Sequence, residues 1–329
     1  MEKALVSVIV PVYNTAEYID ECVQTILSQS YRHIELLLVN DGSTDSSGLV
    51  CRKYLDLPNV RYFELERSGV TVARKTGVEA ARGEWIMFVD SDDLIEADTV
   101  EEMLKHTQDR GIVVAWQIGN PDLLKAPDRY EWKEYLYRVY SGKGVSGATW
   151  AKLYRRQMLM DCPSAFEYKQ IQTQDYLTNL AIAVKNRKPV NICKKAVYTH
   201  RMRALSVIHT VKYTYDYLYD FCAEADAIVK DYLSEDEMVL GRLEKHMFFF
   251  YRILLENQFE VKPDHPFVKD TRRCLDEAGL QRPLDRWLLS TSSPRVARMV
   301  WNLKKIERRL EQPSLIKHDI HRIKDFLTR

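Results

Sequence analysis

Val6-Ser-Val-Ile-Val10 is the stretch that decides the fold of this chain. The run is short, continuous and rich in β-branched residues, as in a parallel strand that is buried on both faces. Apolar residues at helical spacing follow from Ile19 to Leu27, with Thr15 as the expected cap, and a second strand-like run covers Ile34 to Val39. This order predicts a βαβ unit.

The alternation of strands and helices continues to about residue 93. Val60 to Leu65 has the pattern of a strand, Val70 to Ala81 that of a helix, and Trp85 to Val89 that of another strand. Strands that alternate with helices predict a mainly parallel sheet with right-handed crossovers. We therefore predict an α/β fold, a Rossmann-like sheet flanked by helices.

The length of the chain and its residue pattern predict a second, helical part, and the end of this part is basic. A chain of 329 residues exceeds what one core usually supports, and the pattern beyond about residue 210 is helical throughout. We expect a catalytic domain over 1–209 and a helical region over 210–329. The net charge is +1, but residues 282–329 carry twelve Lys or Arg against five Asp or Glu, so the tail is basic.

Cysteine usage and the N-terminus indicate where the chain works. The six cysteines form no CxxC pair, which argues against a zinc site or a disulfide framework and fits a reducing cytoplasm. The apolar run Leu5 to Val12 is too short for a signal peptide core or a membrane span. We expect a cytoplasmic chain.

Three carboxylates stand within four residues at Asp90-Ser-Asp92-Asp93, directly after a predicted strand. Their repulsion favours a bound cation, and carboxylate oxygens suit Mg²⁺ or Mn²⁺. The alternative is a solvated turn that caps the next helix. Tyr13, Asp41 and Asp90 each follow a strand end, where ligands bind in such sheets, so we expect them to meet at one edge.

Each of the other polar candidates also has a structural alternative. The carboxylate of Asp41 can accept a hydrogen bond from the imide N–H of a nucleobase, or it can form an Asx turn. Tyr13 can stack on that base, or be a half-buried aromatic at a strand end. Arg74 and Lys75 can hold phosphate, or belong to a solvated helix face.

Four motifs in order and spacing closely resemble the inverting glycosyltransferases of the large family 2, which have the GT-A fold. The motifs are Val-Ser-Val-Ile-Val-Pro-Val-Tyr-Asn, Val-Asn-Asp-Gly-Ser-Thr-Asp, Ser-Gly-Val-Thr-Val-Ala-Arg and Phe-Val-Asp-Ser-Asp-Asp, and they cover the first hundred residues. Weaker similarity appears at Trp150 to Arg155, at Gln174-Asp175 and at Tyr198 to Arg201. The resemblance implies a GT-A domain with a nucleotide-sugar half over 1–110, an acceptor half over 111–209 and a C-terminal helical appendage.

The resemblance also implies roles for individual residues. Asp175 corresponds to the catalytic base, and Asp92 to the ligand of a Mn²⁺ or Mg²⁺ ion that bridges the diphosphate. His209 is a late metal or phosphate contact, or else an ordinary surface histidine. Ser68 and Lys75 stand where many members have asparagine. Gln174 stands where a glutamate commonly precedes the base, so the environment of the base and the acceptor preference stay open. The implied donor-binding residues are Pro11, Val12, Tyr13, Asp41, Arg74, Asp90 and Ser91.

The implied reaction is metal-assisted transfer of a sugar from a nucleotide-diphosphate sugar, by default a UDP-sugar, to an acceptor hydroxyl with inversion. The acceptor would be a glycan, a lipid-linked sugar or a glycoprotein in the synthesis of a cell-surface polysaccharide or glycoconjugate, and no nucleic acid partner is implied. The alternative is a non-catalytic GT-A protein that binds a nucleotide sugar or a partner. Nucleotidyl transfer and dinucleotide oxidoreduction are disfavoured because the chain lacks GxxxxGK and has Pro-Val-Tyr-Asn where GxGxxG would stand. Aromatic residues that either contact the acceptor or pack in the core are Trp116, Trp150 and Tyr154.

The basic tail has two interpretations. From about Pro294, one predicted helix face is apolar, and the remaining positions are rich in arginine and lysine. Such a helix can lie on an anionic membrane as a peripheral contact on its inner face, or it can pack on its own domain or on a second subunit of a homo-oligomer. The apolar residues are Val296, Met299, Val300, Leu303, Ile306 and Leu310.

Overall fold

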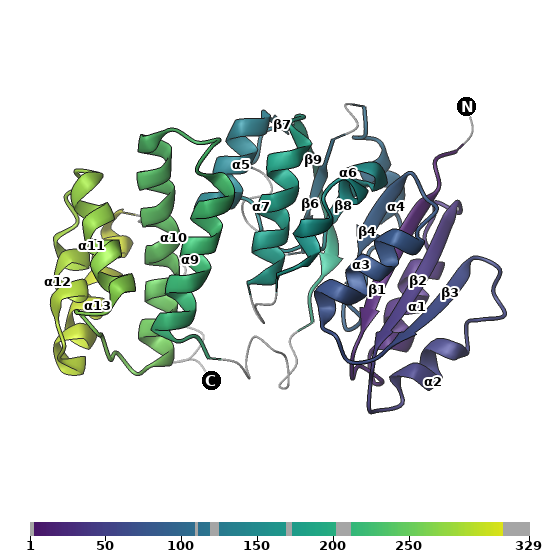
Figure 1. Ribbon diagram of the computed structural model, residues 1–329, viewed down its shortest axis with the longest axis horizontal. Helices are drawn as coiled ribbons and strands as arrows, with labels where there is room; N and C mark the ends of the chain where they lie inside the picture. The colour runs from purple at the N-terminus through teal and green to yellow at the C-terminus, as the bar shows by residue number, and fades with distance from the viewer. Residues whose placement is uncertain (1–2, 109–110, 119–124, 169–172, 202–211, 312–329) are drawn as a thin grey trace, which may run out of the picture. The chain divides into compact units, whose positions relative to one another are not determined.

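A computed structural model gives the fold of the chain (Figure 1) and describes residues 3–108, 111–118, 125–168, 173–201 and 212–311. Contacts divide the chain into two compact units. The first comprises residues 1–211 and 223–234, and the second comprises residues 212–222 and 235–329.

The first unit contains a mixed sheet in which four neighbouring strands form a parallel half. These are β1 (Val6–Val12), β2 (Ile34–Asp41), β3 (Val60–Leu65) and β4 (Trp85–Phe88), in the spatial order β3-β2-β1-β4. Beyond β4 the order continues β8-β6-β9-β5, with β8 antiparallel to β4 and β7 paired to β9. The bounds of these strands are Leu94–Ile95 (β5), Val113–Gln117 (β6), Arg129–Tyr130 (β7), Lys152–Arg155 (β8) and Val190–Thr199 (β9).

Helices follow the parallel strands, as the alternating pattern predicts. Every residue of β1 and β2 is buried, which is why these strands are apolar along their whole length. Helix α3 packs closely on β1, because a Cβ at Gly77 would lie 2.4 Å from Cγ2 of Ile9. The helices of this unit are α1 (Ile19–Leu27), α2 (Ser47–Arg52), α3 (Val70–Ala80), α4 (Thr99–Leu104), α5 (Trp132–Ser141), α6 (Arg156–Met160), a 3-10 turn η2 (Pro163–Phe166) and α7 (Gln174–Asn186).

The expected cap of α1 is wrong. The residue that precedes the helix is Tyr18, whose side chain makes no capping hydrogen bond. Thr15 contributes its backbone carbonyl, which accepts from the N–H groups of Tyr18 and Ile19 at 2.9 Å. Its hydroxyl donates instead to Oγ of Ser91 at 2.9 Å, so Thr15 ties the start of α1 to the acidic segment after β4.

Helices are the only regular elements among the described residues of the second unit. It is built from α10 (Glu235–Glu256), α11 (Pro266–Glu277), α12 (Pro283–Ser290) and α13 (Pro294–Glu311), and α9 (Tyr215–Val229) contributes residues to both units. No helix within the described part of the chain has the length and apolar character that crossing a bilayer requires.

Helix α13 buries only part of the apolar face that its sequence predicts. Val300 is fully buried in the second unit, whereas Met299 and Leu303 are 46% and 42% exposed. Lys304, on the packed side, forms an ion pair at 2.9 Å with Asp285, which is fully buried on α12. The helix therefore packs on its own unit and leaves two apolar side chains exposed.

Candidate active site

Polar side chains gather where the parallel strands end. Because Val12 pairs with Asn40 and Ile9 pairs with Phe88, β1, β2 and β4 end at the same edge of the sheet. Asp41 is the last residue of β2, and the acidic segment that starts at Asp90 comes directly after Val89.

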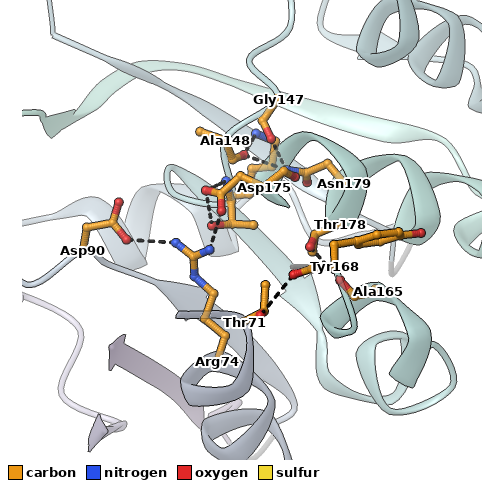
Figure 2. A network of polar contacts seen from close by, with 12 residues as sticks. Thr71, Arg74, Asp90, Gly147, Ala148, Ala165, Tyr168, Asp175, Thr178 and Asn179 are labelled. Carbon is orange, nitrogen blue, oxygen red and sulfur yellow. Dashed lines mark hydrogen bonds and ion pairs between the residues drawn. The ribbon is translucent and has the colours of Figure 1, made fainter. Parts of the chain in front are cut away.

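Arg74 joins two carboxylates that are 85 residues apart in the sequence. Its Nη2 donates to Oδ1 of Asp90 at 3.0 Å, and its Nη1 donates to Oδ1 of Asp175 (Figure 2). Arg74 is 3% exposed, and burial alone would lower its pKa, but the charges of Asp175 and Asp90 outweigh burial and raise it. The alternative that Arg74 belongs to a solvated helix face is therefore excluded, since the guanidinium is buried between two acids.

The carboxylates of the acidic segment after β4 are partly or fully buried close together and repel one another. Burial raises the pKa of Asp90, Arg74 opposes that rise, and the charges of Asp175 and Asp92 add to it. Burial, followed by repulsion from Asp90, raises the pKa of Asp93 to about 7. Carboxylates that resist ionisation because of burial and, to a lesser extent, because of one another form a site suited to a cation.

Asp93 has a structural role that is separate from the rest of the segment. It accepts a hydrogen bond from the hydroxyl of Tyr198 at 2.8 Å and another from the backbone N–H of Arg201 at 2.9 Å. The same tyrosine oxygen accepts from the N–H of Asp90 at 3.1 Å. Tyr198 therefore fixes the backbone of the acidic segment against β9.

Asp175 lies in the first turn of α7, where the helix dipole favours a negative charge. Its Oδ2 accepts from the backbone N–H of Thr149 at 3.2 Å and from the hydroxyl of Thr149 at 3.0 Å, while Oδ1 faces Arg74. A carboxylate offers about four lone-pair positions, and these three donors use three of them. The geometry orients Asp175 and still leaves room for one more donor.

The loop that carries Thr149 is held by two buried side chains. The ammonium of Lys152 donates to the carbonyl of Ser146 at 2.9 Å and to that of Ala148. Asn179, one turn after Asp175 on α7, donates to the carbonyl of Ala148 at 2.9 Å (Figure 2). Burial lowers the pKa of Lys152 to about 7, against the opposing charge of Asp175.

Sequence reasoning missed the supports of Asp175. No motif singles out Thr149, whose two donors become apparent only when α7 is placed beside the loop. Lys152 did leave a signal, because a lysine inside the apolar run Trp-Ala-Lys-Leu-Tyr is a buried lysine that needs partners.

Asp41 and Tyr13 are brought together by Arg67. Asp41 is 1% exposed and accepts from the backbone N–H of Ser68 at 2.7 Å and that of Gly69 at 3.0 Å. Arg67 forms an ion pair with Oδ2 of Asp41, and its guanidinium lies 3.6 Å from the ring centroid of Tyr13.

Three further donor-binding candidates are buried. Pro11 and Val12 are the last two residues of β1, and Ser91 is 5% exposed, with its hydroxyl accepting from Thr15. They lie at the predicted edge of the sheet, but they have little surface to offer a ligand.

The structure describes only one of the two predicted metal ligands. Asp92 is partly exposed, close enough to Asp90 to raise the pKa of that carboxyl. His209 lies outside the described residues. Within the described ranges no group of three or more His, Cys, Asp or Glu side chains is placed to hold a metal ion. One or two carboxylates are nevertheless enough for an ion that takes its other ligands from phosphate and water.

The aromatic candidates for acceptor contact separate by exposure. Trp116 is 4% exposed and Tyr154 is fully buried with its hydroxyl donating to Asn179 at 2.7 Å, so both pack in the core. Trp150 is partly exposed and stacks on Tyr198, with ring centroids 4.7 Å apart and an interplanar angle of 13°.

Comparisons with known proteins agree with this geometry. Residues 7–162 match the family model described as "Glycosyl transferase family 2". The chain is 30% identical over 275 residues to the glycosyltransferase GlyA of Streptococcus pneumoniae serotype 4, which covers 76% of this chain and 37% of that protein. It is 31% identical over 223 residues to the putative glycosyltransferase EpsH of Bacillus subtilis, which covers 63% of this chain and 64% of that protein. The chain thus spans between about a third and two thirds of the length of these relatives.

Solved structures share the fold over nearly the whole chain. TarS 1–349 of S. aureus, in complex with UDP-GlcNAc, superposes with a TM-score of 0.66 at 21% identity, covering 92% of each chain. The mannosyltransferase PcManGT of Pyrobaculum calidifontis, in complex with GDP-Man and Mn²⁺, superposes with a TM-score of 0.51 at 17% identity, covering 95% of this chain and 82% of that one. The predicted GT-A fold, a mainly parallel α/β core followed by helices, is confirmed.

Proposed function

This chain belongs to glycosyl transferase family 2, and we propose that it transfers a sugar, with inversion, from a nucleotide-diphosphate sugar to an acceptor hydroxyl in the synthesis of a cell-surface polysaccharide or glycoconjugate. The observation that carries the proposal is the buried Arg74, which joins Asp90 to Asp175. Asp90, which we assign to donor binding, and Asp175, which we assign to the acceptor, thus form ion pairs with the same guanidinium.

The donor is a UDP-sugar in this proposal. Asp41 takes the imide hydrogen of the base, and Tyr13 stacks on its ring, with Pro11 and Val12 behind. Asp90 and Ser91 follow β4 at the same sheet edge, so Asp90 reaches the ribose. TarS, which shares the fold, has been solved with UDP-GlcNAc and with UDP.

Asp92, with His209 as a further contact, would hold a Mn²⁺ or Mg²⁺ ion in this proposal. The residues present fit such an ion, because a cation would offset the repulsion between Asp90 and its neighbouring carboxylates. A bound divalent ion would supply charge neutralisation of the leaving diphosphate. The chain's own contribution is to hold Asp92 in the segment that Tyr198 and Arg201 fix through Asp93.

Asp175 acts as the general base. The acceptor oxygen forms a bond to the anomeric carbon while the bond from that carbon to the diphosphate oxygen breaks, and the acceptor's proton passes to Asp175. The diphosphate leaves with the bonding electron pair, so charge and atoms balance. Thr149 and Arg74 orient the carboxylate, and the remaining lone pair faces the incoming hydroxyl in this proposal.

We place the enzyme in the cytoplasm, with α13 as a peripheral contact on the inner face of the membrane. The exposed Met299 and Leu303 lie among Arg295 and Arg298, the pattern of a helix that meets anionic lipid. Sedimentation with anionic vesicles should retain wild type and lose the double variant Met299→Gln and Leu303→Gln. Equal sedimentation of both would leave α13 as a packing or homo-oligomer element.

The proposed function is tested by release of nucleoside diphosphate from a panel of nucleotide sugars. Wild type should release it with Mn²⁺ and stop when the metal is chelated, and Asp92→Ala should be inactive with Mn²⁺ present. Asp161→Ala, which removes an exposed carboxylate after α6, should behave as wild type. If wild type binds a nucleotide sugar but releases nothing with any acceptor extract, the non-catalytic alternative replaces this proposal.

A further inference from the structure

The side chain of Arg67 makes, within the protein itself, the two contacts proposed for the donor base. Its guanidinium lies 3.6 Å from the ring centroid of Tyr13, and it donates to Oδ2 of Asp41. A guanidinium is planar and carries N–H donors at its edge, as a uracil or guanine ring does at its imide side. Arg67 therefore occupies the aromatic face and the carboxylate oxygen that the donor base would use.

A base cannot use the same face of Tyr13 and the same oxygen of Asp41 while Arg67 stays in place. Stacked atoms lie about 3.5–4 Å apart, so the gap between the guanidinium and the ring of Tyr13 is already one stacking distance. The second proposed contact is also used, because Oδ2 of Asp41 receives both Arg67 and the N–H of Gly69. A base can reach these residues only after the guanidinium leaves.

The side chain of Arg67 can move without moving its backbone. The following residues, Ser68 and Gly69, are fixed by their N–H groups on Asp41, and the backbone of Arg67 lies against Gly42, where an added Cβ would be 2.8 Å from its nitrogen. The Arg67 side chain, in contrast, is 52% exposed, so rotation into solvent costs only its two contacts.

We propose that Arg67 is a gate of the base site, which occupies the positions of the donor base on Tyr13 and Asp41 when no nucleotide is bound and must swing into solvent before the base enters. The proposal rests on the proposed function, because it takes Tyr13 and Asp41 as the base contacts. The gate keeps the carboxylate of Asp41 satisfied in the empty enzyme, and it lowers the affinity for the donor by the strength of the Arg67 contacts. A base with an imide N–H returns a donor to Asp41 in exchange, whereas a ligand without one leaves Asp41 with only the backbone N–H groups of Ser68 and Gly69.

The test is titration of UDP into the full chain by calorimetry, comparing wild type with Arg67→Ala. Losing an exposed cation–π contact and a half-exposed ion pair should tighten UDP binding by about three- to tenfold. Arg67→Lys keeps the charge without the flat stacking surface and should fall between the two proteins.

Arg52→Ala is the matched control. Arg52 also pairs with a carboxylate, Glu64, and lies 4.7 Å from the centroid of an aromatic ring, Tyr62, and it is 48% exposed, but neither partner belongs to the proposed base site. This variant should bind UDP as wild type does. Its behaviour separates a local effect from a general effect of removing a stacked arginine.

Each outcome decides between defined alternatives. Tighter binding by Arg67→Ala, with no change in Arg52→Ala, supports the gate. Unchanged or weaker UDP binding by Arg67→Ala overturns it, and weaker binding would make Arg67 a clamp that closes over the base. If none of these proteins binds UDP or GDP, the assignment of Tyr13 and Asp41 to a base fails together with the proposed function.

Discussion

Replacing Lys152 with methionine is expected to remove a rise in stability between pH 7 and pH 9. Lys152 is 1% exposed on β8, and burial lowers its pKa to about 7, with the charge of Asp175 opposing that change. In the unfolded chain a lysine keeps its proton to a pKa of about 10.4. The unfolded state therefore binds more protons than the folded state throughout this window.

The sign and size follow from proton linkage. Because the unfolded state binds more protons, the free energy of unfolding rises with pH, by up to about 1.4 kcal/mol for each pH unit. Lys152 is about half protonated in the folded protein at pH 7, so the gain from pH 7 to pH 9 is about 2 kcal/mol. Methionine has a similar volume and no proton to lose, so Lys152→Met should lack this gain.

The assay is urea unfolding followed by tryptophan fluorescence at pH 7 and pH 9. Groups that titrate in both proteins, such as the buried thiol of Cys22 with its raised pKa, cancel in the comparison. Lys185→Met, at an exposed position near the end of α7, is the control and should keep the wild-type pH dependence. Equal pH dependence in wild type and Lys152→Met would refute the burial argument, because Lys152 would then keep its proton in the folded protein.

Two further substitutions test the packing around the site. Arg74→Met should destabilise the protein by about 3 kcal/mol in urea unfolding. This is the lower end of the range for a broken buried ion pair, because the side chains of Asp90 and Asp175 are 29% and 21% exposed and keep some hydration. A loss below about 1 kcal/mol would show that the ion pairs are not buried as described. Gly77→Ala should lower stability by about 1–3 kcal/mol through overpacking, since its Cβ would lie 2.4 Å from Cγ2 of Ile9, and a rise in the thermal midpoint would contradict the close approach of α3 to β1.

The parallel half of the sheet could be predicted because its signal is local. A strand buried on both faces must be apolar along its length, as β1 and β2 are, and the strand ends then lie at one edge by topology alone. The role of Arg74 could not be predicted in the same way. Its partners Asp90 and Asp175 lie on separate elements, and a basic residue on a helix is far more often solvated than buried between acids.

The contacts between side chains and loops could not be predicted from the sequence either. The pairing of Thr149 with Asp175 depends on how the loop before β8 meets α7, and neither residue's neighbours reveal it. Which part of the apolar face of α13 is buried could not be predicted for a similar reason. Periodicity shows that a helix has an apolar side, but the angle at which it packs decides whether Val300 or Met299 is buried.

The most direct test of the central claim is Asp175→Asn. An asparagine of the same shape can still accept a hydrogen bond from Arg74, but it cannot take a proton from an acceptor. The variant should bind UDP within about threefold of wild type and release UDP from its UDP-sugar at least about a hundredfold more slowly, the usual loss for a general base. Asp161→Asn should match wild type in both measurements. Normal UDP binding by Asp175→Asn together with near-normal release would contradict the account and place the base elsewhere.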